Sequence, residues 1–283
     1  MLTIVSWNIQ YGKGVDGRID LSRIADVVRR DGLPDVLCLQ EVSRCDPDTD
    51  NGRDQVNELQ KLFPDYELFY GAAHDRCGGK DGGRRQFRNL VLTRHSPVQV
   101  LHHLLPSPAD STAKFMARQT TEMVIRTSSG ELRMMNTHLE FFSEKQQLAQ
   151  IQRIREIHTE ACAQFREPGL NLPNSPFERV ERPEKMVICG DFNFVPDSDS
   201  HRLMTAPMSA ETPDIVDAWY AAYPDKSRSP TCGIFDHKQW KKGPHCRDYF
   251  FLSQNLVKQI QDVSVNTETD ASDHQPIRLI LEV

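Results

Sequence analysis

The sequence of 283 residues predicts an α/β fold in which two packed mixed β-sheets are flanked by helices. Two observations lead to this prediction. Short apolar runs alternate with helical periodicity over the first third of the chain, whereas strand-like runs separated only by turns follow one another in the middle. Alternation of strands with helices favours parallel pairing of the strands, and hairpins favour antiparallel pairing. We therefore expect sheets that contain both kinds of pairing. No linker divides residues 1–283, and we therefore expect a single domain.

The first third opens with a β-rich run over residues 1–9. Leu21, Ile24 and Val28 then recur at the spacing of one helical face, and Gly32 ends that helix. The other elements predicted in this part are strands over 35–42, 66–70 and 89–93 and a helix over 55–63.

The middle and the last third contain hairpins and one long helix. Ser128-Ser129-Gly130 is predicted to connect two antiparallel strands, and Ile151 and Ile154 belong to an apolar stripe on a helix over 143–165. The strands predicted in these parts are 98–105, 119–126, 131–139, 185–189, 247–252, 257–265 and 276–283.

The composition is that of an ordinary folded protein, with 38% hydrophobic and 26% charged residues. The formal net charge of −6 argues against a chain that binds nucleic acid chiefly through its phosphates, since such proteins present a basic field. Positive charge is concentrated only between Arg76 and Arg88, on a glycine-rich segment expected to be a mobile loop. The alternative explanation, which requires no binding function, is that this segment is a solvated surface loop.

Cysteine usage and hydropathy bear on location. The seven cysteines include no CxxC pair, which is typical of a reduced protein and not of a disulfide scaffold. No apolar stretch approaches the ~18 residues of a membrane span, and no signal-peptide pattern precedes the first strand. We therefore expect a soluble cytoplasmic protein without integral membrane association.

Polar signatures stand where the apolar strands end. Buried strands normally end in turn residues, but these end in carboxylates, carboxamides and imidazoles, which hold hard cations and move protons. Taken singly, each signature is compatible with an ordinary turn, and together they indicate one hydrolytic metal site. The signatures are Ser6-Trp7-Asn8, Leu39-Gln40-Glu41, Asn136-Thr137-His138-Leu139-Glu140, Gly190-Asp191-Phe192-Asn193, Arg247-Asp248-Tyr249 and Ser272-Asp273-His274.

Asn8 and Glu41 end neighbouring apolar runs and offer oxygen ligands suited to Mg²⁺ or Mn²⁺. Asn8 alone could be a turn residue. Glu41 is harder to dismiss, because a charged side chain directly after an apolar run is costly to bury without a partner.

Other residues of the signatures suit acid and base chemistry. Asp191 and Asn193 flank a phenylalanine, so in an extended segment both would point to one face, one to take a proton and the other to contact a phosphoryl oxygen. His274 next to Asp273, with Asp248 on an earlier strand, indicates an imidazole oriented by a carboxylate. His138 supplies a second imidazole.

The order and the residue composition of these signatures resemble those of the endonuclease/exonuclease/phosphatase superfamily over essentially the whole chain. The resemblance implies a four-layer α/β sandwich and a Mg²⁺-dependent phosphoesterase, with Mn²⁺ as the other candidate cofactor. It also implies residue roles: Asn8, Glu41 and Asp273 as metal ligands, Asp191, His274, His138, Asp248 and Asn193 as catalytic residues, and Arg118 and Asn136 as substrate-binding residues.

The family resemblance does not decide the substrate. Our prediction is a phosphodiesterase or phosphatase acting on a small or lipid-headgroup ester, and the alternatives are a DNA or RNA nuclease and a non-catalytic binding protein on the same fold. Segments 71–87, 168–183 and 224–246 match no branch of the family, and such loops set substrate choice. Cys232, His237, His245 and Cys246 do not have a recognised zinc-finger spacing.

Overall fold

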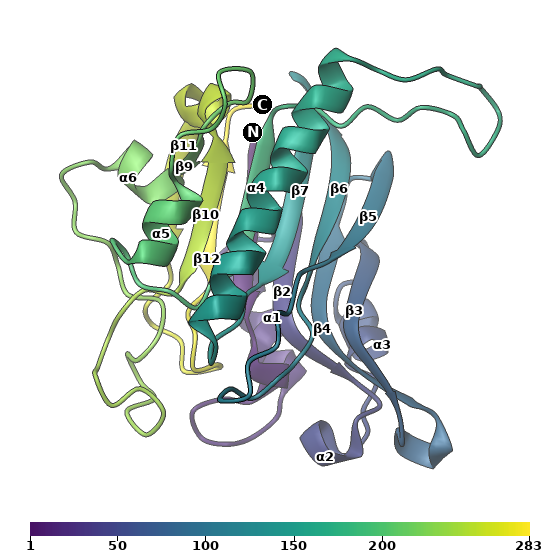
Figure 1. Ribbon diagram of the computed structural model, residues 1–283. Helices are drawn as coiled ribbons and strands as arrows, with labels where there is room; N and C mark the ends of the chain where they lie inside the picture. The colour runs from purple at the N-terminus through teal and green to yellow at the C-terminus, as the bar shows by residue number, and fades with distance from the viewer.

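The computed structural model describes residues 1–283 and shows two six-stranded mixed sheets packed face to face (Figure 1). The predicted α/β sandwich is confirmed. The first sheet has the order β11-β12-β1-β2-β4-β3, with β1 Leu2–Asn8, β2 Val36–Arg44, β3 Glu67–Cys77, β4 Arg84–Thr93, β11 Ile260–Val265 and β12 Ile277–Leu281. The second has the order β5-β6-β7-β8-β10-β9, with β5 Gln99–Leu104, β6 Gln119–Thr127, β7 Gly130–His138, β8 Met186–Asp191, β9 Ile215–Asp217 and β10 Asp248–Ser253.

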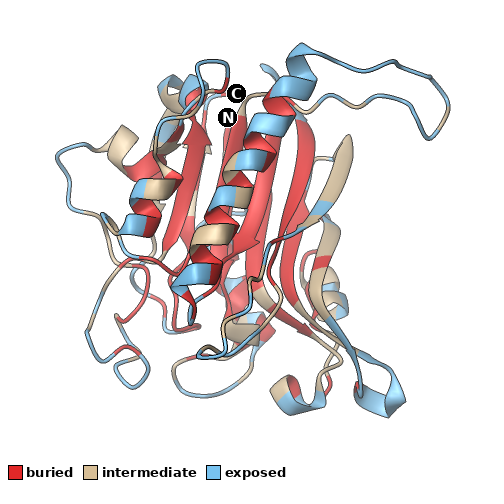
Figure 2. Ribbon diagram, in the orientation of Figure 1, coloured by how far each residue is buried: buried red, intermediate tan, exposed pale blue.

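Helices cover the outer face of each sheet. On the first sheet, Leu21 and Ile24 of α1 pack against Leu37 and Leu39 of β2. On the second, the apolar stripe of α4 packs against residues of β7, β8 and β10, and Figure 2 shows α4 alternating between buried and exposed sides. The helices are α1 Leu21–Arg30, α2 Pro47–Asp50, α3 Gln55–Leu62, α4 Glu144–Arg166, α5 Asp199–Met204 and α6 Ala218–Ala222. No helix is both long enough and apolar enough to span a membrane.

Three apolar cores separate the four layers. The largest contains residues from both sheets, such as Ile4 and Val36 from the first and Ile125 and Val187 from the second, so it fills the space between them. The other two lie under the helices of either side. Strands with a core on both faces must be apolar throughout, which explains why β1, β2 and β8 read as continuous apolar runs.

The pairing register places the predicted site residues at one end of both sheets. In the second sheet, β7 runs parallel to β8 with His138 opposite Asp191, and β8 runs antiparallel to β10 with Asp191 opposite Asp248. In the first sheet, β1 runs parallel to β2, which places Asn8 beside the residue that precedes Glu41. Strand pairing alone therefore aligns polar groups that are far apart in the sequence.

The segment from 71 to 87 is not the mobile loop that its glycines and charges suggested. The β3–β4 ladder continues through it as far as the pair Cys77 and Arg84, with one irregularity between Ala72 and His74. Only the tip, a short 3₁₀ turn at Lys80–Gly82, is unpaired. The segment forms a projecting two-stranded arm, visible at the lower right of Figure 1 and largely exposed in Figure 2.

Candidate active site

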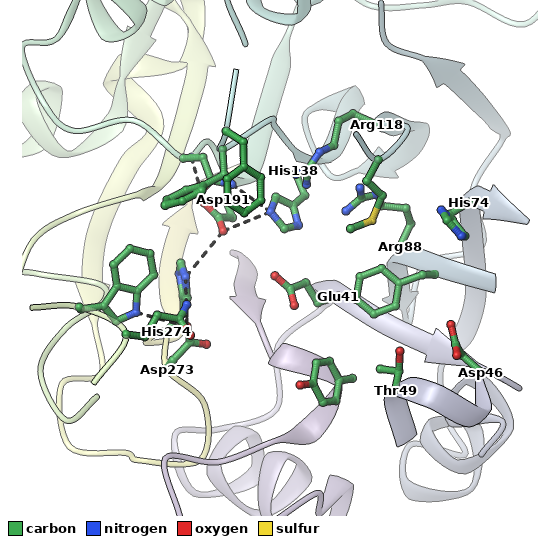
Figure 3. Close-up of a pocket in the computed structure, with 18 residues that line it drawn as sticks. Glu41, Asp46, Thr49, His74, Arg88, Arg118, His138, Asp191, Asp273 and His274 are labelled. Carbon is green, nitrogen blue, oxygen red and sulfur yellow. Dashed lines mark hydrogen bonds and ion pairs between the residues drawn. The ribbon is translucent and has the colours of Figure 1, made fainter. Parts of the chain in front are cut away.

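A pocket of about 410 Å³ opens where the two sheets meet at this end. Asp191, His138 and His274 lie together on one side of it, Arg88 and His74 lie on the other, and Glu41 lies between them (Figure 3). Nine of the ten predicted site residues are at the pocket. Seven line it: Glu41, Arg118, His138, Asp191, Asn193, Asp273 and His274. Asn8 and Asp248 are hydrogen-bonded to lining residues.

Asp191 is the centre of the hydrogen-bond network. Its Oδ1 accepts from the backbone N–H of Asn193 at 2.9 Å, and its Oδ2 accepts from Asn8 Nδ2 at 3.0 Å. The same Oδ2 lies 3.4 Å from His138 Nε2 and 3.7 Å from His274 Nε2. Burial raises the pKa of Asp191, His274 opposes that rise and Asp248 adds to it. A buried carboxylate with a raised pKa is a stronger base than one in water.

His274 lies between carboxylates. Its Nδ1 is 2.8 Å from Asp248 Oδ2, and its Nε2 faces Asp191 and Asp273. Burial by itself would lower the pKa of His274, but the three carboxylates outweigh it and hold that pKa well above the usual value. The imidazole is therefore cationic at neutral pH, and Thr231 Oγ1 completes the arrangement by donating to Asp248 Oδ2 at 2.6 Å.

His138 is in the opposite charge state. Burial, together with the nearby Arg118 and Arg88, holds the pKa of His138 well below its usual value. Asn193 Nδ2 lies 3.0 Å from His138 Nε2, and in the tautomer that accepts this bond the ring proton lies on Nδ1, which is buried and has no partner. The site thus combines one cationic imidazole with one neutral imidazole that has a free N–H group.

Glu41 and Asp273 have the chemistry of a hard-cation site. A bulge in β2 gives Glu41 a left-handed φ of 59° and points its side chain into the pocket. Burial and then Asp273 raise the pKa of Glu41, and burial raises the pKa of Asp273. Two mutually repelling carboxylates that fit oxygen-preferring Mg²⁺ or Mn²⁺ are therefore placed where a counter charge would stabilise both. Asn8 lies beside them and donates Nδ2 to Glu41 Oε1 at 3.0 Å.

Asp191, Asp248 and His274 also bring one potential ligand atom each within 4.8 Å of one another. Within this trio, His274 directs its Nδ1 toward Asp248. Glu41 and Asp273 form a second acidic set beside it.

Two arginines contribute unpaired donors to the same pocket. Arg118 Nε donates to Glu140 Oε2 at 3.0 Å, but its Nη1 is buried without a partner. Arg88 donates Nε and Nη2 to the carbonyl of Ala117, has no carboxylate partner, and leaves its Nη1 unpaired. Arg118 lies immediately before β6, and its ion pair with Glu140 is buried.

Asn136, predicted to bind substrate, does not line the pocket. Its Nδ2 donates to the carbonyls of Leu39 and Leu90 at 3.2 Å each, and its Oδ1 accepts from Gln40 Nε2 at 2.8 Å. These bonds join the second sheet to the first directly beneath the site. The zinc alternative also finds no support, since Cys232 and His245 meet at 3.2 Å while Cys246 turns toward Asp248 and Arg228.

A family model described as endonuclease/exonuclease/phosphatase family matches residues 5–274. The chain belongs to this family. An exodeoxyribonuclease of Bacillus subtilis (strain 168) is 20% identical over 303 residues, covering 100% of both chains.

Solved structures of endonuclease/exonuclease/phosphatase proteins share the fold. One from Beutenbergia cavernae has a TM-score of 0.72 at 21% identity and is matched over 100% of this chain and 71% of its own. A mannosyl-6-phosphatase from Bacteroides thetaiotaomicron has a TM-score of 0.68 at 19% identity, with 100% of both chains covered.

Segment 224–246, which matched no branch of the family, supplies site residues that the sequence did not reveal. Gln239 Nε2 and Trp240 Nε1 both donate to Asp273 Oδ2, at 2.8 and 3.3 Å. At the end of this segment, Arg247 donates Nη1 to the carbonyl of Asn193 at 2.7 Å. No spacing or periodicity marked Gln239 or Trp240, because their contact with Asp273 depends on how an irregular loop folds back.

Proposed function

We propose that this chain is a divalent-cation-dependent hydrolase of small phosphate esters. One observation carries the proposal: the pocket has unpaired donors on one wall and surplus carboxylates on another. The buried donors without acceptors are His138 Nδ1, Arg118 Nη1 and Arg88 Nη1, while Glu41 and Asp273 are carboxylates with raised pKa values. An anion and a cation bound together would satisfy both walls, as a phosphate ester with its metal ion does.

The residues would divide the chemistry as follows. Asp191 would take a proton from the attacking water, and the unpaired Nδ1 of His138 would donate to a phosphoryl oxygen. Asn193, whose Nδ2 donates to His138 Nε2 and to the carbonyl of Leu139, would position that imidazole. Cationic His274, held by Asp248, would stabilise the negative charge of the transferring group. Glu41 and Asp273, assisted by Asn8, would hold the cation, which when bound neutralises phosphoryl charge as a Lewis acid.

The basic hairpin, residues 76–88, supports a small substrate over a polynucleotide. Arg84 pairs with Asp75 at 2.7 Å, and Arg85 pairs with Asp48 at 2.7 Å. Arg84 and Arg85 are therefore less available to phosphates than the sequence suggested, whereas Arg76 and Lys80 form no ion pair. The nuclease alternative is kept because the matched Bacillus subtilis protein is named an exodeoxyribonuclease.

The proposal is tested by a panel of substrates with Mg²⁺ and with Mn²⁺. The panel contains a sugar phosphate, bis-p-nitrophenyl phosphate, single- and double-stranded DNA, and sphingomyelin. Asp191→Asn should lower kcat by about 10²- to 10⁴-fold with an unchanged Tm, since it removes the base and keeps the shape. Asp197→Asn, at an exposed position nearby, is the matched control and should keep the wild-type rate.

Turnover confined to small esters would support the proposal. Cleavage of DNA that falls steeply with added salt would favour the nuclease alternative. Cleavage confined to sphingomyelin would move the substrate to the lipid class. An Asp191→Asn variant as active as the wild type would contradict the assignment of this site.

A further inference from the structure

Aromatic side chains line much of the pocket beyond the catalytic cluster. Six of its 18 lining residues are hydrophobic, and five of those six are aromatic: Tyr11, Phe87, Phe141, Phe142 and Trp240, with Met116 as the sixth. Catalysis by the residues described above uses none of these rings. They are therefore available to contact the part of the ester that does not react.

Phe141 and Phe142 are exposed large aromatic side chains. Their exposed fractions are 42% and 54%, and both line the pocket. Their rings are nearly perpendicular, with centroids 5.0 Å apart. A large aromatic side chain left half open to water beside a catalytic site is the kind of surface that usually acquires a partner.

The backbone of Phe141 and Phe142 is held by Glu140, which forms an ion pair with Arg118. The backbone N–H groups of Phe141 and Phe142 both donate to Glu140 Oε1, at 2.9 and 2.8 Å. The other oxygen of Glu140 accepts from Arg118. The Arg247 guanidinium carbon lies 5.0 Å from the centroids of both the Phe141 and the Trp240 rings, which contact each other edge to face, so it packs against both. Contact with such a surface requires little ordering of the protein, which favours binding.

Cations lie against the aromatic wall. The Arg247 guanidinium packs on Phe141 and Trp240, and Lys114 Nζ lies 5.1 Å from the centroid of the Phe142 ring. The electron-rich face of an aromatic ring attracts such cations, whereas a saturated ring does not. The charges beside this wall therefore favour an aromatic ring over a saturated one.

We propose that the pocket selects esters in which a planar aromatic ring is attached, directly or through a short linker, to the reacting phosphate. The ring lies against Phe142 and the Phe141–Trp240 wall. This inference rests on the proposed function and names its substrate class. Aromatic rings attract one another by edge-to-face and offset contacts, which a saturated ring of similar size makes less well. Two sources share this chemistry, a nucleobase of a nucleotide and a simple aryl or benzyl group.

The test compares benzyl phosphate with cyclohexylmethyl phosphate, because both release primary alcohols and differ mainly in ring planarity. The wild type should have the lower KM for the benzyl ester. Phe142→Ala should raise that KM about tenfold, in the range found for removal of an aromatic stacking partner, and leave the cyclohexylmethyl KM nearly unchanged. Phe115→Ala, which removes another exposed ring that does not line the pocket, is the matched control and should change neither KM.

Two further experiments identify the source of the ring and distinguish failure of this inference from failure of the proposed function. Thymidine 5′-phosphate compared with deoxyribose 5-phosphate tells whether a nucleobase serves as the ring. Calorimetric binding of benzylphosphonate and cyclohexylmethylphosphonate reports the same preference without turnover. If Phe142→Ala weakens both members of a pair equally, or neither, the inference is wrong. If the inference fails in this way but turnover still depends on Asp191, the proposed function stands. If no ester is turned over but benzylphosphonate still binds more tightly than cyclohexylmethylphosphonate, only the proposed function is contradicted.

Discussion

The imidazole of His274 and the carboxylate of Asp248 lie 2.8 Å apart, Nδ1 to Oδ2, across the junction of the two sheets. Asp248 begins β10 of the second sheet, and His274 precedes β12 of the first. The sandwich must therefore close before this pair can form. Packing of the two sheets and assembly of the candidate active site are thus one event in this fold.

Asp248→Asn should move the alkaline limb of the pH profile of kcat to lower pH. In the wild type, the carboxylates hold the pKa of His274 well above its usual value, so the cation persists through neutral pH. With one carboxylate removed, that pKa falls and the imidazole loses its proton at lower pH. Proton NMR titration of the ring gives the shift directly, and an unmoved alkaline limb would contradict the electrostatic role of the pair.

Arg247 should act as a positioning residue. Its guanidinium fixes the carbonyl of Asn193, which has a left-handed φ of 57°, and also donates Nε to His245 Nε2 at 2.9 Å. Arg247→Met keeps much of the packing and loses both bonds, so we expect kcat to fall about tenfold with a smaller change in KM. Arg247→Lys should recover part of the loss. Equal losses in kcat and in Tm, without rescue by lysine, would indicate a structural role only.

Asn136→Leu tests the residue that the structure places beneath the pocket. The substitution leaves the carbonyls of Leu39 and Leu90 buried without donors, which should lower the free energy of unfolding by about 2 kcal/mol. Because the side chain does not line the pocket, the KM of the folded enzyme should change little. A large rise in KM at constant stability would restore the substrate-binding role predicted from the sequence.

His158 should make the protein less stable in mild acid. Its Nδ1 accepts from buried Arg133 at 2.7 Å and its Nε2 donates to the carbonyl of Pro213 at 3.0 Å, an arrangement of the neutral ring. Burial, with Arg133, lowers the pKa of His158 to about 4. Between about pH 6.5 and 4 the unfolded chain thus binds more protons, so the free energy of unfolding falls as pH falls, by on the order of 3 kcal/mol in total.

Urea unfolding at pH 7 and pH 4.5 measures this effect. His158→Gln can still accept from Arg133 and donate to Pro213 but does not titrate, so its loss of stability between the two pH values should be smaller than that of the wild type. Equal losses in the two proteins would show that His158 does not contribute to acid sensitivity.

Much of the fold and most of the site residues could be predicted because their signals are local. Apolar runs that end in Asn8, Glu41 and Asp191 mark strands whose ends converge, and Ser143 caps α4 as its sequence suggests. Asn136 could not be distinguished from a pocket residue, since its direction depends on the packing of the two sheets. Likewise, the contact of Trp240 with Asp273 depends on an irregular segment that no periodicity describes.

The hairpin of residues 71–87 shows how competing signals mislead. Glycines and like charges favour a solvated loop, but β3 and β4 were already paired, and extending an existing ladder costs less than starting one. Cross-strand partners such as Asp75 for Arg84 then reduce the repulsion among the arginines.

The most direct test of the proposed function is turnover of the best substrate in H₂¹⁸O with Mg²⁺. We expect one ¹⁸O atom in the phosphoryl product and none in the released alcohol, since water attacks phosphorus. This incorporation should disappear with EDTA and in Asp191→Asn, and it should persist in Asp197→Asn. Label in the alcohol, or hydrolysis that survives both EDTA and the loss of Asp191, would contradict attack by an activated water at this site.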